Sequence, residues 1–145
     1  MPFHYRLLGK DRMALYSFIQ SLNTTFGTLI FEPVAVNLAK DRFAVAQSQY
    51  IVGDQISEGC QQVIQKIMNN LTLGKSPNKT LELKMIRDAS SKGRINQMKT
   101  IKADLFVETK EGEKFLFDLK TAKPNISNFK DFKRTLLEWA GITYT

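Results

Sequence analysis

Two aspartates and a lysine, Asp104, Asp118 and Lys120, lie in neighbouring stretches that could form the two strands of a hairpin. Apolar and polar residues alternate over 101–108 and again over 114–120. Alternation with a period of two predicts β-strands. Residues 110–112, Lys-Glu-Gly, fit a three-residue loop because glycine accepts a left-handed backbone. With this loop, Asp104 lies across from Asp118, with the two Cβ atoms roughly 5 Å apart.

These side chains suit phosphodiester chemistry with a divalent metal ion. Mg²⁺ prefers oxygen ligands and is held by one or two carboxylates together with phosphate oxygens. Such an ion polarises the phosphorus and activates water. Lys120, on the same strand face as Asp118, could hold that water or stabilise the transition state. The competing interpretation is a solvated ion pair, but Phe106 and Leu116 share the face and favour a less solvated site.

The residues around this hairpin resemble the PD-(D/E)XK nuclease superfamily, with Ala103 in place of the proline of its name. The flanks, residues 117–125 and 129–139, resemble type II restriction endonucleases of the TdeIII kind. Upstream, residues 21–32 resemble the Ser-x-x-Thr-x-x-Gly-x(4)-Glu helix segment of several restriction enzymes, which ends here in Glu32. Together these segments span about 17–139, with a poorly matched middle.

The resemblance implies Mg²⁺-dependent cleavage of double-stranded DNA at a short specific sequence, usually by a homodimer. It implies that Asp104 and Asp118 are metal ligands and that Lys120 is the catalytic lysine. Glu32 would be the helix-borne acid that completes the site, directly or through water. Members of this family continue beyond the helix at 136–139, whereas this sequence stops at Thr145. The alternatives are a truncated or degenerate member, or a piece of a longer protein.

The composition favours one globular domain over 1–145, in the cytoplasm, with an anionic partner. The chain has 145 residues and is 43% hydrophobic, which is enough for a single core. A lone cysteine, Cys60, excludes an internal disulfide framework and a zinc site. No signal peptide is visible, and no apolar run approaches the roughly 20 residues of a membrane span. The net charge of +7 suits a nucleic acid.

Basic residues near the hairpin are candidates for contacts with DNA. The stretch from Lys84 to Lys102 carries six cations against one acid, and its Ser-Ser-Lys-Gly sequence predicts a loop. The last predicted helix also has a basic side. Ordinary solvated surface is the competing interpretation for both. The candidate DNA-binding residues are Lys92, Arg94, Lys99, Lys102, Lys123, Asn125, Lys133 and Arg134.

We expect a mixed α/β fold in which N-terminal helices precede a small central β-sheet with flanking helices, a restriction-endonuclease-like core. Apolar spacing predicts helices over 10–22, from 23–25 to about 38 or 39, and over 48–71. A loop over 73–79 and a strand over 80–85 would precede the hairpin. A final helix would begin at 127 or 128, and residues 142–144 could open another strand. The predicted buried stripe of that last helix is Phe129, Phe132, Leu136 and Ala140.

Three functions remain open at this point. The leading hypothesis is a Mg²⁺-dependent type II restriction endonuclease. The second keeps the fold and changes the substrate, as in a structure-selective repair or junction-resolving nuclease, and branched DNA compared with plain plasmid would separate the two. The third is a non-catalytic DNA-binding module, whose binding would be indifferent to the loss of Asp118 or Lys120.

Overall fold

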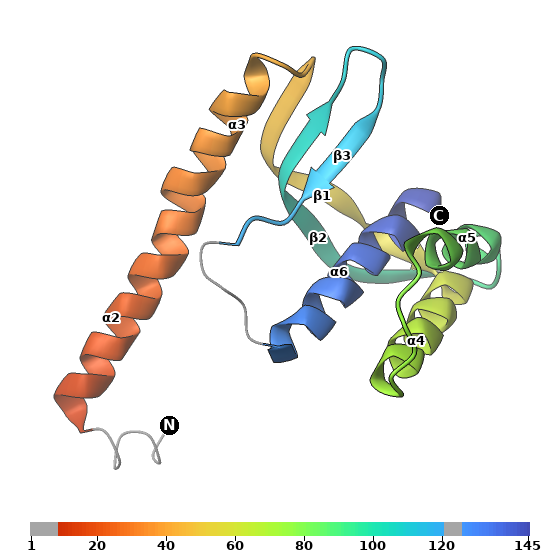
Figure 1. Cartoon of the computed structure of the whole chain (residues 1–145), viewed down its shortest axis with the longest axis horizontal. Coiled ribbons are helices and arrows are strands. Elements are labelled where there is room, and N and C mark those ends of the chain that lie inside the picture. Colours follow the sequence, from red (N-terminus) through yellow and green to blue (C-terminus); the bar gives the residue numbers. More distant parts are fainter. Residues whose placement is uncertain (1–8, 121–125) are drawn as a thin grey trace. The chain divides into compact units, whose positions relative to one another are not determined.

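A computed structural model describes residues 9–120 and 126–145 and shows a mixed α/β fold, which confirms the predicted fold class (Figure 1). The helical elements are α2 (Lys10–Phe26), the π-helical turn η1 (Gly27–Phe31), α3 (Glu32–Lys40), α4 (Glu58–Thr72), α5 (Lys79–Ala89) and α6 (Ile126–Tyr144). The strands are β1 (Val45–Ser57), β2 (Ile95–Glu108) and β3 (Lys114–Phe117). They form one antiparallel sheet in the order β1-β2-β3.

The chain divides into two compact units. Unit 1 comprises Met1–Gln49 and Asp104–Lys123, and unit 2 comprises Tyr50–Ala103 and Pro124–Thr145. Strands β1 and β2 contribute residues to both units. All four predicted catalytic residues belong to unit 1, whereas most of the predicted DNA-binding residues belong to unit 2.

A continuous helical run in unit 1 leads from α2 through η1 into α3 (Figure 1). The predicted start of a second helix at 23–25 is wrong, because these residues lie inside α2. Pro33 explains the π turn: in a regular α-helix, its ring would clash with the carbonyl four residues earlier. The wider turn relieves this clash, and the Glu32 N–H donates to the Gly27 carbonyl, five residues back. Pro33 therefore lies in the first turn of α3.

Helix α3 packs on the strands of unit 1 through a small apolar cluster. The cluster consists of Ala39, Leu105 and Val107, with Ala35, Val36, Phe43 and Ala46 packed against it. Leu105 and Val107 point to one face of β2, as the alternation in the sequence predicts. Phe106 points to the opposite face and is also buried. Both faces of β2 are thus covered next to Asp104.

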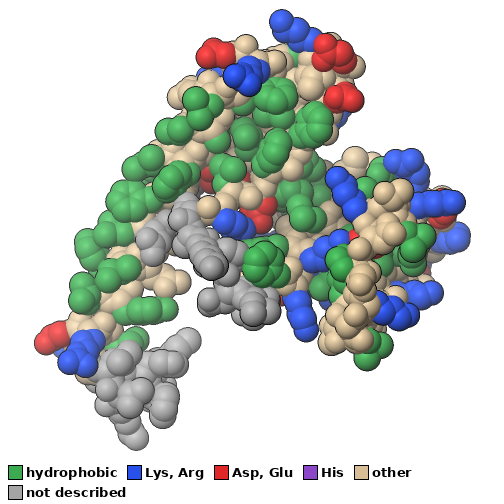
Figure 2. Space-filling model, viewed as in Figure 1, with side chains coloured by type: hydrophobic (Ala, Val, Ile, Leu, Met, Phe, Trp, Pro, Cys, Tyr) green, Lys and Arg blue, Asp and Glu red, His purple; other side chains and the backbone are tan. Residues whose placement is uncertain are grey.

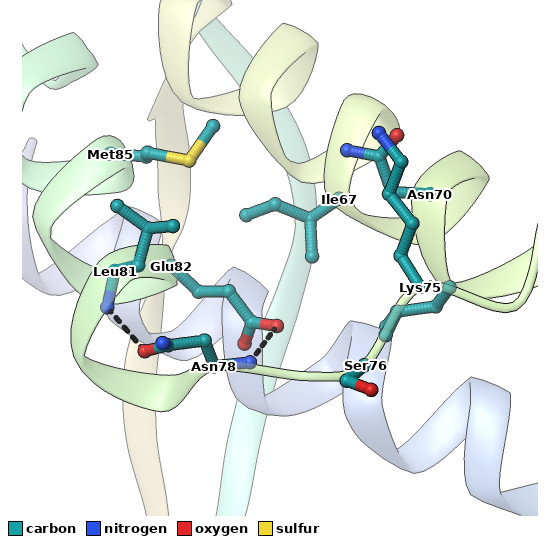
Figure 3. Close-up of a pocket in the computed structure, with 9 residues that line it drawn as sticks. Ile67, Asn70, Lys75, Ser76, Asn78, Leu81, Glu82 and Met85 are labelled. Atoms are coloured by element: carbon teal, nitrogen blue, oxygen red, sulfur yellow. Dashed lines mark hydrogen bonds between the residues drawn. The ribbon is translucent and has the colours of Figure 1, made fainter.

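Unit 2 contains the larger core, enclosed by α4, α5 and α6. Its buried members are Ile56, Cys60, Ile64, Ile67, Met68, Ile86 and Leu137. Helices α4 and α5 each begin at a side-chain cap, which satisfies an otherwise unpaired backbone N–H. The Ser57 hydroxyl accepts from the Cys60 N–H at 3.1 Å, and the Asn78 side chain accepts from the Leu81 N–H at 3.0 Å (Figure 3).

Two predicted elements of unit 2 are wrong and a third needs new limits. The predicted helix over 48–71 begins only at Glu58, and residues 45–57 form β1. Val52 and Ile56 are four residues apart. This spacing puts two residues on the same face in a helix and also in a strand. Residues 80–85 belong to helix α5 and not to a strand, and residues 142–144 end helix α6 instead of opening a strand.

The buried side of α6 matches the predicted stripe only in part, since Ala140 packs against the core of unit 2. Phe129 and Leu136 are 57% and 48% exposed, whereas Leu137 and Trp139 are buried. Gly141 lets the helix approach the core closely, because a Cβ there would lie 2.8 Å from Ile56 Cδ1. The periodicity gave the helix correctly, but the side that it buries depends on its packing partners.

Apolar side chains remain exposed along α2 and η1, where Figure 2 shows hydrophobic groups following the helix. The apolar stripe consists of Leu15, Phe18, Ile19, Phe26, Leu29 and Ile30, each 44% exposed or more. Their spacing keeps them on one side of the helical run. Within 9–120 and 126–145, no helix has the length and apolarity that a membrane crossing requires.

Replacing Ile86 with alanine tests the core of unit 2. Ile86 is fully buried, whereas Leu81 on the same helix is 55% exposed. Ile86→Ala should lower the free energy of unfolding by about 2–5 kcal/mol, because it leaves a cavity. Leu81→Ala, the matched control, should change it by about 0.5 kcal/mol or less. Urea denaturation followed by circular dichroism measures both, and equal losses would contradict this core.

Candidate active site

The register of the hairpin brings Asp104 and Asp118 together. Strands β2 and β3 pair in antiparallel fashion, with Leu105 opposite Phe117 and Phe106 opposite Leu116. The next pair in this register is Asp104 opposite Asp118, as the sequence predicts. Strand β3 itself ends at Phe117, so Asp118 and Lys120 lie just beyond it, and the predicted strand over 114–120 is too long.

A side-chain hydrogen bond holds the chain where the strand pairing stops. The Leu119 N–H donates to Asp104 Oδ2 at 2.7 Å. Asp118, the residue before, forms an ion pair with the ammonium of Lys120. The Asp118 side chain is 21% exposed and that of Lys120 is 41% exposed. Asp118 is therefore only partly solvated, whereas Lys120 is more exposed to water.

The environment of Asp104 disfavours its charged form. Burial raises the pKa of the Asp104 carboxyl above its usual range, and the hydrogen bond from Leu119 opposes this shift. Asp118 raises the same pKa through a side-chain hydrogen bond and through its charge. The charge of Glu32 adds to the effect. The structure thus brings Asp118 and Glu32 within electrostatic reach of Asp104 in unit 1.

Glu32 enters the site from the first residue of α3, where only 6% of it is exposed. Gln49 Nε2 donates to both of its carboxylate oxygens, at 2.9 Å and 2.8 Å. Gln49 has a φ of +51°, the one positive value at a non-glycine residue of the described segments. Such a conformation costs about 1–3 kcal/mol. Sequence reasoning missed Gln49, because no local pattern marks this conformation or this partner.

The donor set of the site fits a hard divalent cation. Asp104 and Asp118 offer carboxylate oxygens side by side, and a cation between them would relieve the repulsion that raises the pKa of Asp104. In the described segments, no three His, Cys, Asp or Glu side chains gather closely enough to hold a metal ion by themselves. Mg²⁺ needs only one or two carboxylates, since water and substrate phosphate complete its shell.

The predicted DNA-binding residues of unit 2 lie in two places. Lys92 and Arg94 are exposed in the turn between α5 and β2, and Lys99 and Lys102 are exposed on β2. The predicted loop around Ser90–Gly93 is confirmed as a turn. The Gly59 N–H donates to the Lys92 carbonyl at 2.9 Å, which fixes this turn to the start of α4.

The two basic residues predicted on α6 have partners within unit 2. The Lys133 ammonium pairs with the buried carboxylate of Glu82, and Arg134 donates to Gln65 Oε1 at 3.0 Å. Contacts with phosphate would compete with these interactions. Lys123 and Asn125, the remaining two predictions, lie outside the described residues.

The raised pKa of Asp104 predicts a pH-dependent gain of stability for Asp104→Asn without divalent metal ions. Asparagine keeps an oxygen for the Leu119 N–H and removes the charge that Asp118 and Glu32 repel. Because the folded state binds the Asp104 proton more tightly than the unfolded state, ionisation lowers stability as pH rises through the raised pKa. The variant should therefore unfold at higher urea than the wild type at pH 7.

The advantage of Asp104→Asn should shrink as pH falls toward 3.8, the usual value for aspartate, because the wild-type carboxyl is then protonated in the folded state. Urea denaturation at a series of pH values measures the difference. Asp131→Asn, at an exposed site on α6, is the control and should show no such trend. An Asp104→Asn variant that is less stable at pH 7 would contradict the electrostatic account.

Comparison with known proteins assigns the chain to a family. The HinfI type II restriction endonuclease family matches residues 1–144. The type II restriction enzymes HgiCII and HgiEI of Herpetosiphon aurantiacus are each 27% identical over 139 residues, or 94% of this chain. The chain spans about half the length of these relatives, with 50% of each covered. No solved structure matches.

The matched family refines the resemblance seen in the sequence, which was to restriction enzymes of the TdeIII kind. Both are type II restriction endonucleases, so the general resemblance is confirmed and the family named is a different one. The match extends over the helical run with Glu32, over the hairpin with Asp104 and Asp118, and over α6. The chain belongs to the HinfI family of type II restriction endonucleases.

Proposed function

We propose that this chain carries the active site of a Mg²⁺-dependent endonuclease of the PD-(D/E)XK superfamily, which hydrolyses double-stranded DNA at a short specific sequence. The observation that carries the proposal is the hairpin register, which pairs Leu105 with Phe117 and, extended by one residue, sets Asp104 opposite Asp118. Lys120 follows two residues later and pairs with Asp118. Membership of a type II restriction endonuclease family supports this chemistry, and the relatives are named as type II restriction enzymes.

Each polar group of the hairpin has a defined task in this proposal. Asp104 and Asp118 would hold the Mg²⁺ ion, which would supply a Lewis acid for the phosphate and for water. The Leu119 N–H keeps Asp104 turned toward Asp118 through its 2.7 Å hydrogen bond. Lys120 orients the attacking water and stabilises the negative charge that develops on the phosphate oxygens. Its ion pair with Asp118 keeps this ammonium beside the metal ligands.

DNA binding in this proposal relies on cations that attract the phosphate backbone. Lys92, Arg94, Lys99 and Lys102 are exposed and suit this task. Lys123, Asn125, Lys133 and Arg134 complete the proposed set. We also propose a homodimer, in which each copy cuts one strand of a symmetric site. The exposed apolar stripe of α2 and η1 supports association, because large apolar patches on soluble proteins mark interaction surfaces.

Removing Asp118 or Lys120 should abolish cleavage and preserve DNA binding. Asp118→Asn and Lys120→Met should each lower the cleavage rate by at least about 100-fold, because each removes a group that acts on the developing charge. Plasmid cleavage with Mg²⁺, and with EDTA in parallel, measures the rate, and a gel-shift assay measures binding.

The matched controls for this test are Asp131→Asn and Lys130→Met, at exposed neighbouring positions of α6. Both should cleave like the wild type and give the same discrete bands. A wild-type chain that binds DNA without cutting it would contradict the proposed activity. Cleavage that survives Asp118→Asn would contradict the proposed site.

The salt dependence of DNA binding tests the basic turn before β2. The logarithm of the binding constant falls with the logarithm of salt concentration by about 0.9 for each phosphate contact. Removing both cations with Lys92→Ala and Arg94→Ala should therefore lower this slope by about 1.8. Fluorescence anisotropy at several salt concentrations gives the slope. The pair Lys40→Ala and Arg42→Ala, exposed in unit 1, should leave it unchanged.

A further inference from the structure

We propose that Gln49 is a positioning residue of the metal site, which acts by fixing the carboxylate of Glu32 at the start of α3. The inference rests on the proposed function, since it concerns the same site. It goes further by assigning a task to a residue that no motif includes. It also assigns Glu32 to the second coordination shell, where it acts on the metal through water.

The contact between Gln49 and Glu32 joins two elements that are otherwise distant in the sequence. One amide nitrogen of Gln49, on β1, donates to both oxygens of Glu32, on α3, at 2.9 Å and 2.8 Å. Glu32 is buried and Gln49 is exposed, so the amide lies over the carboxylate. A buried carboxylate needs such donors, because burying its charge without partners is strongly unfavourable.

The backbone of Gln49 indicates that this contact is specifically maintained. Gln49 lies inside β1 with a φ of +51°, although a strand normally keeps φ negative. A left-handed residue within a strand is typical of a bulge, which redirects a side chain. Glycine or asparagine would adopt this conformation more easily than glutamine. A glutamine at this position therefore suggests that the amide, and not the backbone, is what the site requires.

The link from Gln49 to the metal site passes through Glu32. Glu32 lies one helical turn before Ala35 and Val36, which pack against the cluster that contains Leu105, the residue after Asp104. Both oxygens of Glu32 already accept hydrogen bonds from Gln49, and the described segments hold no cluster of three acids fit for a metal ion. We infer that Glu32 acts on the metal through water, and that Gln49 orients it for this task.

A purely structural role for Gln49 makes different predictions. If the amide only ties β1 to α3, its loss would lower the stability of the fold without changing metal affinity. Gln49→Gly separates the two roles, because glycine accepts the positive φ and keeps the backbone while it removes the amide. Gln49→Asn does the same with an amide that is one methylene shorter and falls short of Glu32.

The decisive measurement is the binding of Mn²⁺ without DNA, which electron paramagnetic resonance follows through the signal of the free ion. Mn²⁺ accepts the same oxygen ligands as Mg²⁺. Gln49→Gly and Gln49→Asn should each weaken Mn²⁺ binding by about 10- to 100-fold, the usual effect of removing an outer partner of a metal ligand. Urea denaturation should show Gln49→Gly at least as stable as Gln49→Ala. The control, Gln47→Asn on the same strand, should bind Mn²⁺ like the wild type.

A double-mutant cycle tests whether Gln49 acts through Glu32. Glu32→Gln alone should weaken Mn²⁺ binding, and adding Gln49→Gly should weaken it no further, because the two residues form one interacting pair. Independent, additive effects would overturn the proposed route.

Two further outcomes separate this inference from the proposed function. If Gln49→Gly binds Mn²⁺ as tightly as the wild type while Asp118→Ala does not bind it, the task assigned to Gln49 is overturned and the metal site stands. If the wild type and Asp118→Ala bind Mn²⁺ equally weakly, the metal site fails and the task of Gln49 fails with it.

Discussion

The pairing register of β2 and β3 is the constraint on which the site depends. Side chains alternate between the two faces of a strand, so a slip of one residue would move Asp118 to the face opposite Asp104. The strand pairing reaches Phe117, one residue short of Asp118. Beyond that point, the hydrogen bond from Leu119 to Asp104 maintains the arrangement. One carboxylate therefore serves both the geometry of the site and its proposed chemistry.

Holding the acids together conflicts with the stability of the fold. Asp104 is partly buried, and its burial and the charges of Asp118 and Glu32 all raise its pKa. The chain offsets this repulsion locally. Lys120 pairs with Asp118, and the strained backbone of Gln49 brings an amide to Glu32. Strain and like charges that a protein maintains in this way are typical of functional sites.

The part of the site that the sequence could reveal is the part that local rules govern. Alternation, a glycine loop and two close aspartates were enough to predict the hairpin and the pairing of Asp104 with Asp118. Glu32 came only from the resemblance to restriction enzymes, because 72 residues separate it from Asp104. Gln49 could not be predicted, since its task depends on a long-range contact and on a backbone conformation that no residue pattern encodes.

The errors in the predicted fold also come from long-range contacts that local patterns do not encode. Residues 48–57 were predicted as helix because Val52 and Ile56 match a helical period, although the pairing of β1 with β2 decides their conformation. The helix at 126–144 was predicted, but its buried side was predicted only in part, since Leu137 is selected by the core that it meets. Periodicity identifies an element more reliably than it identifies what the element will contact.

The π turn at Gly27–Phe31 has a consequence for the angular phase of the N-terminal helical run. A turn with five-residue hydrogen bonds contains one residue more than the α-helical turn it replaces. Each residue of an α-helix advances the side-chain direction by about 100°. Deleting one residue from the turn would leave Glu32 in α3 against the strands. It would also rotate the apolar stripe of α2 by roughly that angle. The extra residue thus sets the direction in which unit 1 presents its apolar surface relative to its acidic one.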